Sequence, residues 1–499
     1  MKGTIAKQSL WASAVNYSGS LIGLFTTFYL FPLVYTESQN GIIRLLVEFG
    51  ALLAGVAQLG TGYSIWKFFP VFKNHEKRHN GAGFWLFIIP LLGFLLVAAA
   101  LLGFQPAIAG YLSQKSSGFL PYYLWLLPFV FFFVYNSVFE IFLSSLGNII
   151  YSSFLRENVV RVLMGLVGFL FYTRCFPFDV AVKLTPVIYA LTAIVNLYLI
   201  FRATSISIRP DMAFVRNQPG LQGQFTRYTG YLFITYMANL FVQRMDFAMV
   251  TAMKGLSYTG VYSIALNLAV LVEIPTRSIL QISNPRLAEA IHLKDMAEVR
   301  RLYDKTTLNQ FILGALVLLV IWINIDVFYY FMPNGEKYAF GKYAVLLLGL
   351  GKLVILLQGN SSAMLTFSHR YYYSLFVNLG SVVAGIFLNQ WLIPIWGLEG
   401  AAAATALTWL AAATITGILI YRLYGMNPYR RMVFITIGLF AALFLANAMV
   451  SWPGHFILTA VVKSLLLPGI ALWVIYRFQL STDIRSMIVK GLNRLGYRL

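Results

Sequence analysis

The chain has 499 residues, of which 59% are hydrophobic and 11% charged, and its mean hydropathy is +0.74. A soluble protein carries about 25% charged residues, so this composition excludes an ordinary soluble protein and favours a polytopic membrane protein. Lys and Arg (37) outnumber Asp and Glu (17), for a formal net charge of +20, and the position of that charge decides whether it indicates nucleic acid or membrane topology.

Fourteen stretches are apolar and long enough to span a bilayer, since a spanning helix needs about 20 mostly apolar residues. They lie at residues 9–34, 41–65, 83–104, 120–145, 157–175, 183–203, 227–251, 258–283, 307–331, 342–365, 373–395, 399–422, 432–452 and 456–478. The predicted fold class is therefore an all-α polytopic membrane protein with about 14 transmembrane helices. The first stretch is too long for the apolar region of a signal peptide and lacks a cleavage site, so it is expected to be the first membrane helix.

The loop charges predict the orientation, because Lys and Arg collect on the cytoplasmic side of a membrane protein. With the N-terminus inside, the cytoplasmic segments include KFFPVFKNHEKRHN, PRLAEAIHLKDMAEVRRLYDKTT, YRLYGMNPYRRM and the tail RFQLSTDIRSMIVKGLNRLGYRL, and they hold most of the basic residues. Both termini are therefore predicted to be cytoplasmic. The positive charge has a topological explanation, and no nucleic-acid partner is expected.

A weak internal repeat links the two halves of the chain. The turn TESQ-NGIIRLL leads into the second predicted helix and GLSY-TGVYSIA into the eighth, so that Gly41 matches Gly260 at an offset of 219 and Pro70 matches Pro285 at 215. The repeat predicts two pseudo-symmetric six-helix lobes, residues 1–210 and 211–425, followed by residues 426–499 with two C-terminal helices and a basic cytoplasmic tail. Parallel repeats of this kind are a recurring transporter plan, with the substrate site between them.

Charged residues lie well inside several predicted helices, where each costs at least about 2.5–3.5 kcal/mol and is a functional candidate by default. The basic ones are Arg44, Arg244, Arg277, Lys352 and Lys463, and the acidic ones are Glu48, Glu140, Asp246 and Glu273. The pairs Arg44/Glu48 and Glu273/Arg277 are spaced i,i+4 and can meet on one helix face. Arg244 and Asp246 point to different faces, so each is expected to pair across helices.

Two interpretations of these charges are open. In the structural one, ion pairs tie the helices together or a side chain near a helix end reaches out to water. In the functional one, a cationic, water-filled cavity between the halves receives an anionic head group, because guanidinium binds phosphate bidentately. The predicted substrate-binding residues are then Arg44, Arg244, Arg277 and Lys352. The predicted ion-coupling residues are Glu48, Asp246, Glu273 and Glu140, of which Glu273, next to Pro275, is the best candidate.

The sequence holds no signature of catalysis or of a cofactor. Cys175 is the single cysteine, and the five histidines fall in or beside predicted loops without ligand spacing, so no metal site is expected. There is no phosphate-binding GxxxxGK[ST] loop and no nucleophile–base arrangement. The protein is therefore expected to be no enzyme and to need no cofactor.

The helix order and the repeat motifs resemble the polysaccharide/O-antigen flippases of the multidrug/oligosaccharidyl-lipid/polysaccharide exporter superfamily. The residues that carry the resemblance are NYSGSLIGLFTTFYLFPLVY with NGIIRLL, the exit YSIWKFFPVFKN, and their counterparts SYTGVYSIALNLAVLVEIP and SNPRLAEAIHLKDMAEVRRLYDKTT. The resemblance covers nearly the whole chain, including two extra C-terminal helices.

This resemblance implies a bacterial inner-membrane protein of polysaccharide and lipopolysaccharide biosynthesis, whose two six-helix lobes form a V around a cationic lumen. Such proteins move undecaprenyl-pyrophosphate-linked glycans to the periplasmic leaflet by alternating access, coupled to an ion such as a proton or sodium. The intramembrane charges named above occupy comparable helices. The implied partners are the polyprenyl-pyrophosphate-linked glycan, the coupling ion and membrane lipids.

Three alternatives stay open. A multidrug exporter of the same superfamily would need an acidic and aromatic cavity, and a flippase for a lipid-linked peptidoglycan precursor would share the architecture. A membrane glycan polymerase or ligase, from a different class, would place its catalytic residues in sizeable periplasmic loops, whereas the predicted periplasmic loops are short.

Overall fold

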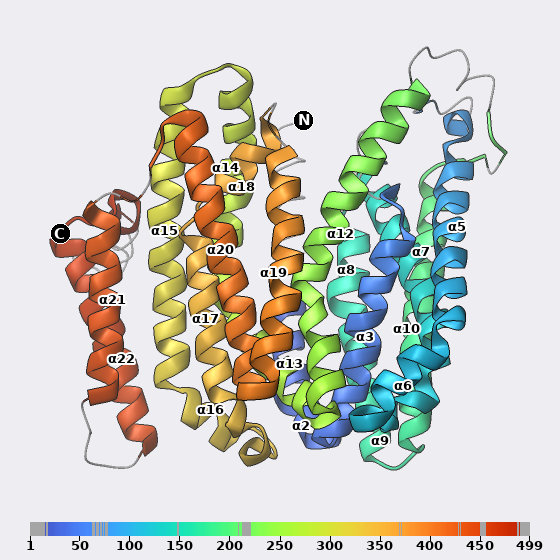
Figure 1. The fold of residues 1–499 in the computed structure, drawn as a ribbon, viewed down its shortest axis with the longest axis horizontal. Coiled ribbons are helices and arrows are strands. Elements are labelled where there is room, and N and C mark those ends of the chain that lie inside the picture. Colours follow the sequence, from blue (N-terminus) through green and yellow to red (C-terminus); the bar gives the residue numbers. More distant parts are fainter. Residues whose placement is uncertain are drawn as a thin grey trace. The chain divides into compact units, whose positions relative to one another are not determined.

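The computed structural model describes residues 15, 18–61, 65, 69, 72, 74, 78–146, 149–207, 209–211, 221–368, 370, 372–427, 429, 431–449, 456–486 and 489. Within these residues the regular structure is helical and no strand occurs (Figure 1). Among them, eleven helices are long and apolar enough to span a membrane, and a shorter apolar helix covers Ser18–Val34. Every one of the 14 predicted stretches overlaps a helix, so the predicted all-α membrane fold is confirmed.

The chain forms two compact units, Met1–Ser263 and Ile264–Leu499. The helices of the first unit are η1 (Thr26–Leu30), α2 (Phe31–Val34), α3 (Glu37–Ala57), η2 (Arg78–Gly81), α5 (Ala82–Gly103), α6 (Gln105–Ser116), η3 (Ser117–Trp125), α7 (Leu126–Ser145), α8 (Ile149–Phe154), η4 (Leu155–Val159), α9 (Val160–Tyr172), α10 (Phe178–Ala203) and α12 (Leu221–Lys254). Helix α13 (Leu256–Val270) begins in this unit and continues into the next.

The helices of the second unit are η5 (Leu271–Glu273), α14 (Ile274–His292), α15 (Met296–Ile323), α16 (Ile325–Phe331), η6 (Gly335–Lys337), η7 (Ala339–Gly341), α17 (Lys342–Leu356), α18 (Ser361–Phe367), α19 (Tyr372–Trp396), α20 (Leu398–Tyr424), α21 (Arg431–Met449) and α22 (Phe456–Arg477). The units divide the chain within α13, and α12, which packs on α3, belongs to the first unit. The predicted lobe bounds, which follow the repeat and not the packing, stay a prediction.

Helix α3 begins at Glu37, four residues before the apolar stretch predicted at 41–65. Its start is a capping box, in which the Thr36 side chain accepts from the Gln39 backbone N–H and the Gln39 side chain accepts from the Thr36 N–H. These bonds satisfy two backbone donors that a helix start leaves without partners, and Glu37 in the first turn suits the helix dipole. Helix α3 packs against α12, α7 and α5, so it lies at the centre of the first unit.

The first unit has an apolar core with a few polar ties. In α7, Phe129 and Val134 are fully buried, and the Phe129 ring meets Tyr189 of α10 edge-on with 4.9 Å between centroids. Asn196 of α10 donates to Asn136 of α7 at 2.8 Å. In a membrane such interhelical hydrogen bonds add to van der Waals packing, because lipid provides no hydrophobic driving force between helices.

In the second unit α15 packs against α14 and α17, while α20 packs against α17 and α19 (Figure 1). The segment after α22 is fixed to α15, because Lys305 and Asn309 donate to the two carboxylate oxygens of Asp483 at 3.0 and 2.9 Å. Partial burial acts to raise the pKa of Asp483, but these hydrogen bonds and the nearby positive charge hold that pKa below its ordinary value.

The N-terminal ends of α3 and α13 meet in a contact that repeats itself at an offset of 219 residues. The hydroxyl oxygens of Ser38 and Ser257 lie 2.7 Å apart. A Cβ atom on Gly41 would lie 2.0 Å from the carbonyl oxygen of Leu256, and one on Gly260 would lie 2.3 Å from that of Glu37. Ser38 and Ser257, Gly41 and Gly260, and Glu37 and Leu256 are three pairs of equivalent positions in the repeat. This contact, which we call the serine–glycine junction, therefore has local pseudo-two-fold symmetry. The two glycines that the repeat matches, Gly41 and Gly260, therefore lie in one contact. The other match, Pro70 with Pro285, is not tested in this way because Pro70 lies outside the described residues.

We expect Gly41→Ala and Gly260→Ala each to destabilise the protein by about 1–3 kcal/mol, because the added methyl group collides with a backbone carbonyl. The matched control is Gly230→Ala in α12, where a Cβ has nothing within 4 Å and the loss of glycine should stabilise by about 0.4–1 kcal/mol. Thermal unfolding of the purified variants in one detergent measures the difference. Equal melting temperatures for all three variants would show that the junction is loosely packed.

Candidate functional site

The intramembrane charges of the first unit include an ion pair between two helices. Arg244 of α12 donates through Nη1 to a carboxylate oxygen of Glu48 on α3, and the two side chains are 30% and 20% exposed. The prediction that Arg244 pairs across helices is therefore confirmed. The carboxylate holds the guanidinium in place, and both side chains keep part of their surface exposed.

Arg44 lies one turn before Glu48 on α3. Its Nη2 donates to the Thr27 hydroxyl at 3.0 Å, and its guanidinium carbon lies 5.6 Å from the centre of the Phe31 ring. Thr27 belongs to the π-helical turn η1, a kind of helix distortion that often occurs at functional sites. Arg44 is thus fixed against the first membrane helix.

Asp246, two residues after Arg244, is 2% exposed and belongs to a different contact. The hydroxyl of Tyr262 on α13 donates to its Oδ2 at 2.6 Å, and the backbone N–H of Phe247 donates to Oδ1 at 3.0 Å. The expected pairing of Asp246 across helices is confirmed, with a tyrosine of the next helix as partner. This carboxylate ties α12 to α13.

Glu140 of α7 belongs to a chain of four charged side chains, of which the sequence analysis identified Glu140 alone. Arg156 donates to Glu140 and also bonds Glu157 at 3.0 Å, and Glu157 bonds Arg161 at 2.7 Å. Arg161 in turn donates to the carbonyl of Gly19 in the first membrane helix. The missed residues, Arg156, Glu157 and Arg161, stand at the start of the helix predicted at 157–175 and are not among the charges that the sequence analysis singled out. The i,i+4 spacing of Glu157 and Arg161 was the available signal.

In the second unit Lys352 of α17 holds Glu273 at 2.9 Å, and its ammonium lies 4.3 Å from the centre of the Trp409 ring on α20. The side chains of Lys352 and Glu273 are only 12% and 23% exposed, so Lys352 is better shielded from solvent than Arg244. A desolvated ammonium over an indole face gains about 2 kcal/mol. The pair connects three helical elements, η5, α17 and α20.

The expected contact of Glu273 with Arg277 is not formed. Glu273 ends the 3₁₀ turn η5, and Pro275 stands in the first turn of α14, so the α-helical i,i+4 register does not extend across the two residues. Arg277 is exposed and makes no ion pair with the described part of the chain. Lys463, the last intramembrane cation, donates to the Asn447 carbonyl at 3.2 Å and so joins α22 to α21.

The comparisons with known proteins come from structure and not from sequence. No protein-family profile and no curated protein matches the sequence. The lipid II flippase MurJ in an inward closed conformation superposes with a TM-score of 0.72 at 11% identity, over 95% of this chain and 100% of that chain. An inward-facing multidrug resistance MATE family transporter of the MOP superfamily gives 0.62 at 15% identity, over 82% of this chain and 94% of that chain.

A third similar structure is a MOP superfamily transporter from Pyrococcus furiosus, described as having a binding pocket of reverse polarity (TM-score 0.54, 14% identity, 83% of this chain and 93% of that chain). At these identities the likeness establishes the fold. The protein is therefore a multi-pass membrane protein with the fold of MOP-superfamily transporters and flippases. None of the three comparisons singles out the polysaccharide/O-antigen flippases, so that narrower resemblance stays a prediction.

Proposed function

We propose that the protein is a flippase, which moves an undecaprenyl-pyrophosphate-linked oligosaccharide across the bacterial inner membrane by ion-coupled alternating access. The observation that carries the proposal is the partly exposed guanidinium of Arg244, held by Glu48 inside a bundle with a flippase fold. A pyrophosphate and a glycan cannot cross hydrocarbon unaided. Arginine is suited to such a head group because it binds phosphate bidentately and stays charged.

The two cation–carboxylate pairs suggest how binding and ion coupling are linked. Arg244–Glu48 and Lys352–Glu273 are neutral as pairs, so each is tolerated inside the membrane before the substrate arrives. A phosphate that binds Arg244 or Lys352 displaces the carboxylate from its cation. The released Glu48 or Glu273 then needs a proton or a metal cation to stay inside the membrane. Arg277, exposed and without an ion pair among the described residues, needs no such exchange.

In this proposal Arg44, Arg244, Arg277 and Lys352 bind the head group, and Glu48, Asp246, Glu273 and Glu140 take part in coupling. Asp246 and Glu140 have partners that hold helices together, so their share in coupling is indirect. Translocation breaks no covalent bond, so we propose no catalytic residue and no cofactor. We also propose that both chain termini face the cytoplasm, as the loop charges predict.

A flippase for a lipid-linked peptidoglycan precursor is the second candidate. The observation in its favour is that the similarity to the lipid II flippase extends over 100% of that chain, against 94% for the multidrug transporter. The multidrug alternative needs an acidic cavity for cationic drugs. It is less favoured because Glu48 and Glu273 are already neutralised by basic partners.

Reconstitution into liposomes distinguishes the candidates. We expect the purified protein to expose a lipid-linked oligosaccharide on the opposite leaflet, faster with an ion gradient than without one. Parallel liposomes carry lipid II or a fluorescent cationic drug. Transport of the drug, with neither lipid-linked substrate moved, would contradict the flippase proposal. In cells, loss of the protein should trap the lipid-linked repeat unit on the cytoplasmic leaflet, whereas loss of a polymerase would leave single repeat units exported.

A further inference from the structure

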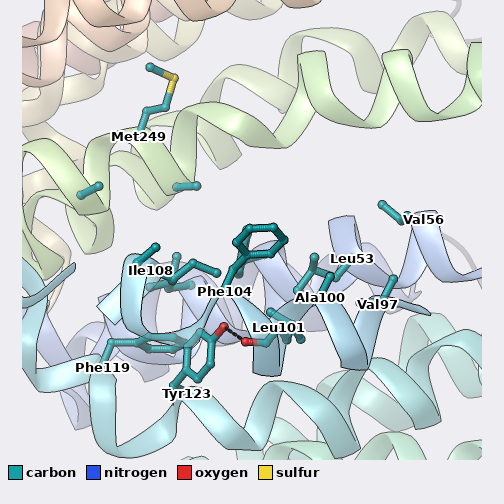
Figure 2. A pocket seen from close by; sticks show the side chains of 15 residues that line it. Leu53, Val56, Val97, Ala100, Leu101, Phe104, Ile108, Phe119, Tyr123 and Met249 are labelled. Carbon is teal, nitrogen blue, oxygen red and sulfur yellow. Dashed lines mark hydrogen bonds between the residues drawn. The ribbon is translucent and has the colours of Figure 1, made fainter. Parts of the chain in front are cut away.

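An apolar cavity of about 620 Å³ lies inside the first unit (Figure 2). Its walls come from five elements, represented by Leu53 of α3, Leu101 of α5, Ile108 of α6, Phe119 of η3 and Met249 of α12. Sites for small molecules commonly measure about 300–1,000 Å³, so the cavity is large enough for a ligand. It is also open on one side, since Ala100, Phe104 and Ala107 in its lining are exposed.

The cavity offers a ligand no hydrogen bond. No charged residue lines it, and the one polar side chain in the lining is Tyr123. The Tyr123 hydroxyl donates to the Leu101 carbonyl at 2.8 Å, so its hydrogen is already used (Figure 2). A cavity of this kind stays dry, because water needs two or more polar partners. Sugars, ions and drug cations are therefore poor ligands, and a hydrocarbon chain is a suitable one.

Two of the helices that line this dry space, α3 and α12, also carry the Glu48–Arg244 ion pair. On α12, Arg244 precedes the lining residue Ala248 by four positions, so the two lie on the same helix face. On α3, its partner Glu48 directly precedes the lining residue Phe49. The first unit thus carries a guanidinium one helical turn before a residue that lines a hydrocarbon-like space. This is complementary to an amphiphile with an anionic head and an apolar chain.

We propose that this cavity holds the first isoprene units of a polyprenyl-phosphate lipid whose phosphate binds Arg244. The proposal rests on the proposed flippase function and deepens it by naming the subsite for the chain. Lipid tails around the protein are as apolar as the cavity, so affinity comes from van der Waals contact and not from the hydrophobic effect. A methyl-branched chain fills a wide cavity with more contacts than a straight acyl chain, which favours the polyprenyl group over membrane phospholipid.

Photolabelling tests the proposal without requiring transport. The probe is a polyprenyl phosphate with a photoreactive diazirine on its first isoprene unit, and the labelled peptides are mapped in the full-length protein in detergent. We expect labels on α5, α6 or α12 next to the cavity, with competition by unlabelled polyprenyl phosphate and not by phosphatidylglycerol. Ala100→Phe and Ala107→Phe, which fill the cavity from its exposed side, should weaken labelling about tenfold, or about 1.4 kcal/mol.

The matched control is Ala99→Phe, an exposed neighbour of Ala100 on α5 that does not line the cavity, and it should label like the wild type. Equal competition by phosphatidylglycerol would show that the cavity holds ordinary membrane lipid, and undiminished labelling of Ala100→Phe would place the chain elsewhere. Either result overturns the subsite. The flippase proposal is tested separately by transport in liposomes. A protein that still moves lipid-linked oligosaccharide there keeps that function, even if photolabelling shows that the cavity does not bind the polyprenyl chain.

Discussion

We expect Arg244→Ala to abolish export of the lipid-linked oligosaccharide, while the protein still folds and inserts into the membrane. The substitution removes the guanidinium that binds phosphate and leaves the Glu48 carboxylate without its partner inside the membrane. A hydrogen bond to a charged group contributes about 1.5–3 kcal/mol, so the lost contacts to phosphate correspond to more than a tenfold loss of binding. The leaflet-exposure assay in liposomes measures export, and thermal unfolding of the same preparation measures folding.

A double variant separates substrate binding from a purely structural role of this pair. Glu48→Gln combined with Arg244→Gln removes both charges and keeps two polar side chains, so it should recover most of the stability that Arg244→Ala loses. Export should stay lost, because no guanidinium is restored. Wild-type export by the double variant would make the pair a structural tie. Lys463→Gln, which removes another intramembrane cation, is the control and should export normally.

Arg277 gives the complementary case. It is exposed and makes no ion pair within the described residues, so Arg277→Ala should leave the melting temperature unchanged. Its export should nevertheless be lost if the side chain meets the head group. Full export by this variant would remove Arg277 from the proposed site.

Joining Ser38 to Ser257 by a disulfide should stop transport. Their hydroxyl oxygens lie 2.7 Å apart, so Ser38→Cys combined with Ser257→Cys should form a disulfide under mild oxidation, with the exposed Cys175 replaced by serine. In the proposed alternating-access cycle the ends of α3 and α13, which belong to different predicted lobes, separate at one stage, and the covalent link prevents this. Export should fall to background in the oxidised protein and return on reduction.

The two single-cysteine variants, treated in the same way, should export normally under both conditions. Full export by the oxidised double variant, with the crosslink verified by gel mobility, would show that the serine–glycine junction stays closed throughout transport. The access change would then have to occur elsewhere in the bundle.

Hydropathy alone predicts where the membrane helices lie, since each of the 14 apolar stretches overlaps a helix. It does not locate the helix starts, as α3 shows, because a capping box is built from polar residues that precede the apolar stretch. It also gives no sign of distortions such as η4 and η5. These depend on tertiary contacts, and η5 is the reason that Glu273 and Arg277 do not meet.

The charge pairs show a similar limit. Sequence spacing predicts neighbours on one helix, and the different faces of Arg244 and Asp246 correctly predicted partners on other helices. The actual partner, Glu48, lies almost 200 positions earlier in the chain, and no local pattern identifies it. The cavity of Figure 2 is equally unpredictable, because its lining consists of common apolar residues from five elements.

The serine–glycine junction also bears on the history of the chain. Gly41 meets Leu256, the repeat equivalent of Glu37, while Glu37 meets Gly260, the repeat equivalent of Gly41. Two identical subunits make such reciprocal contacts across a two-fold axis, and Ser38 and Ser257 meet on that axis. The junction is therefore self-complementary in the way that the interface of a symmetric homodimer of half-length chains would be. Its two sides are not identical, since Asn40 occupies the place that Thr259 holds in the other copy.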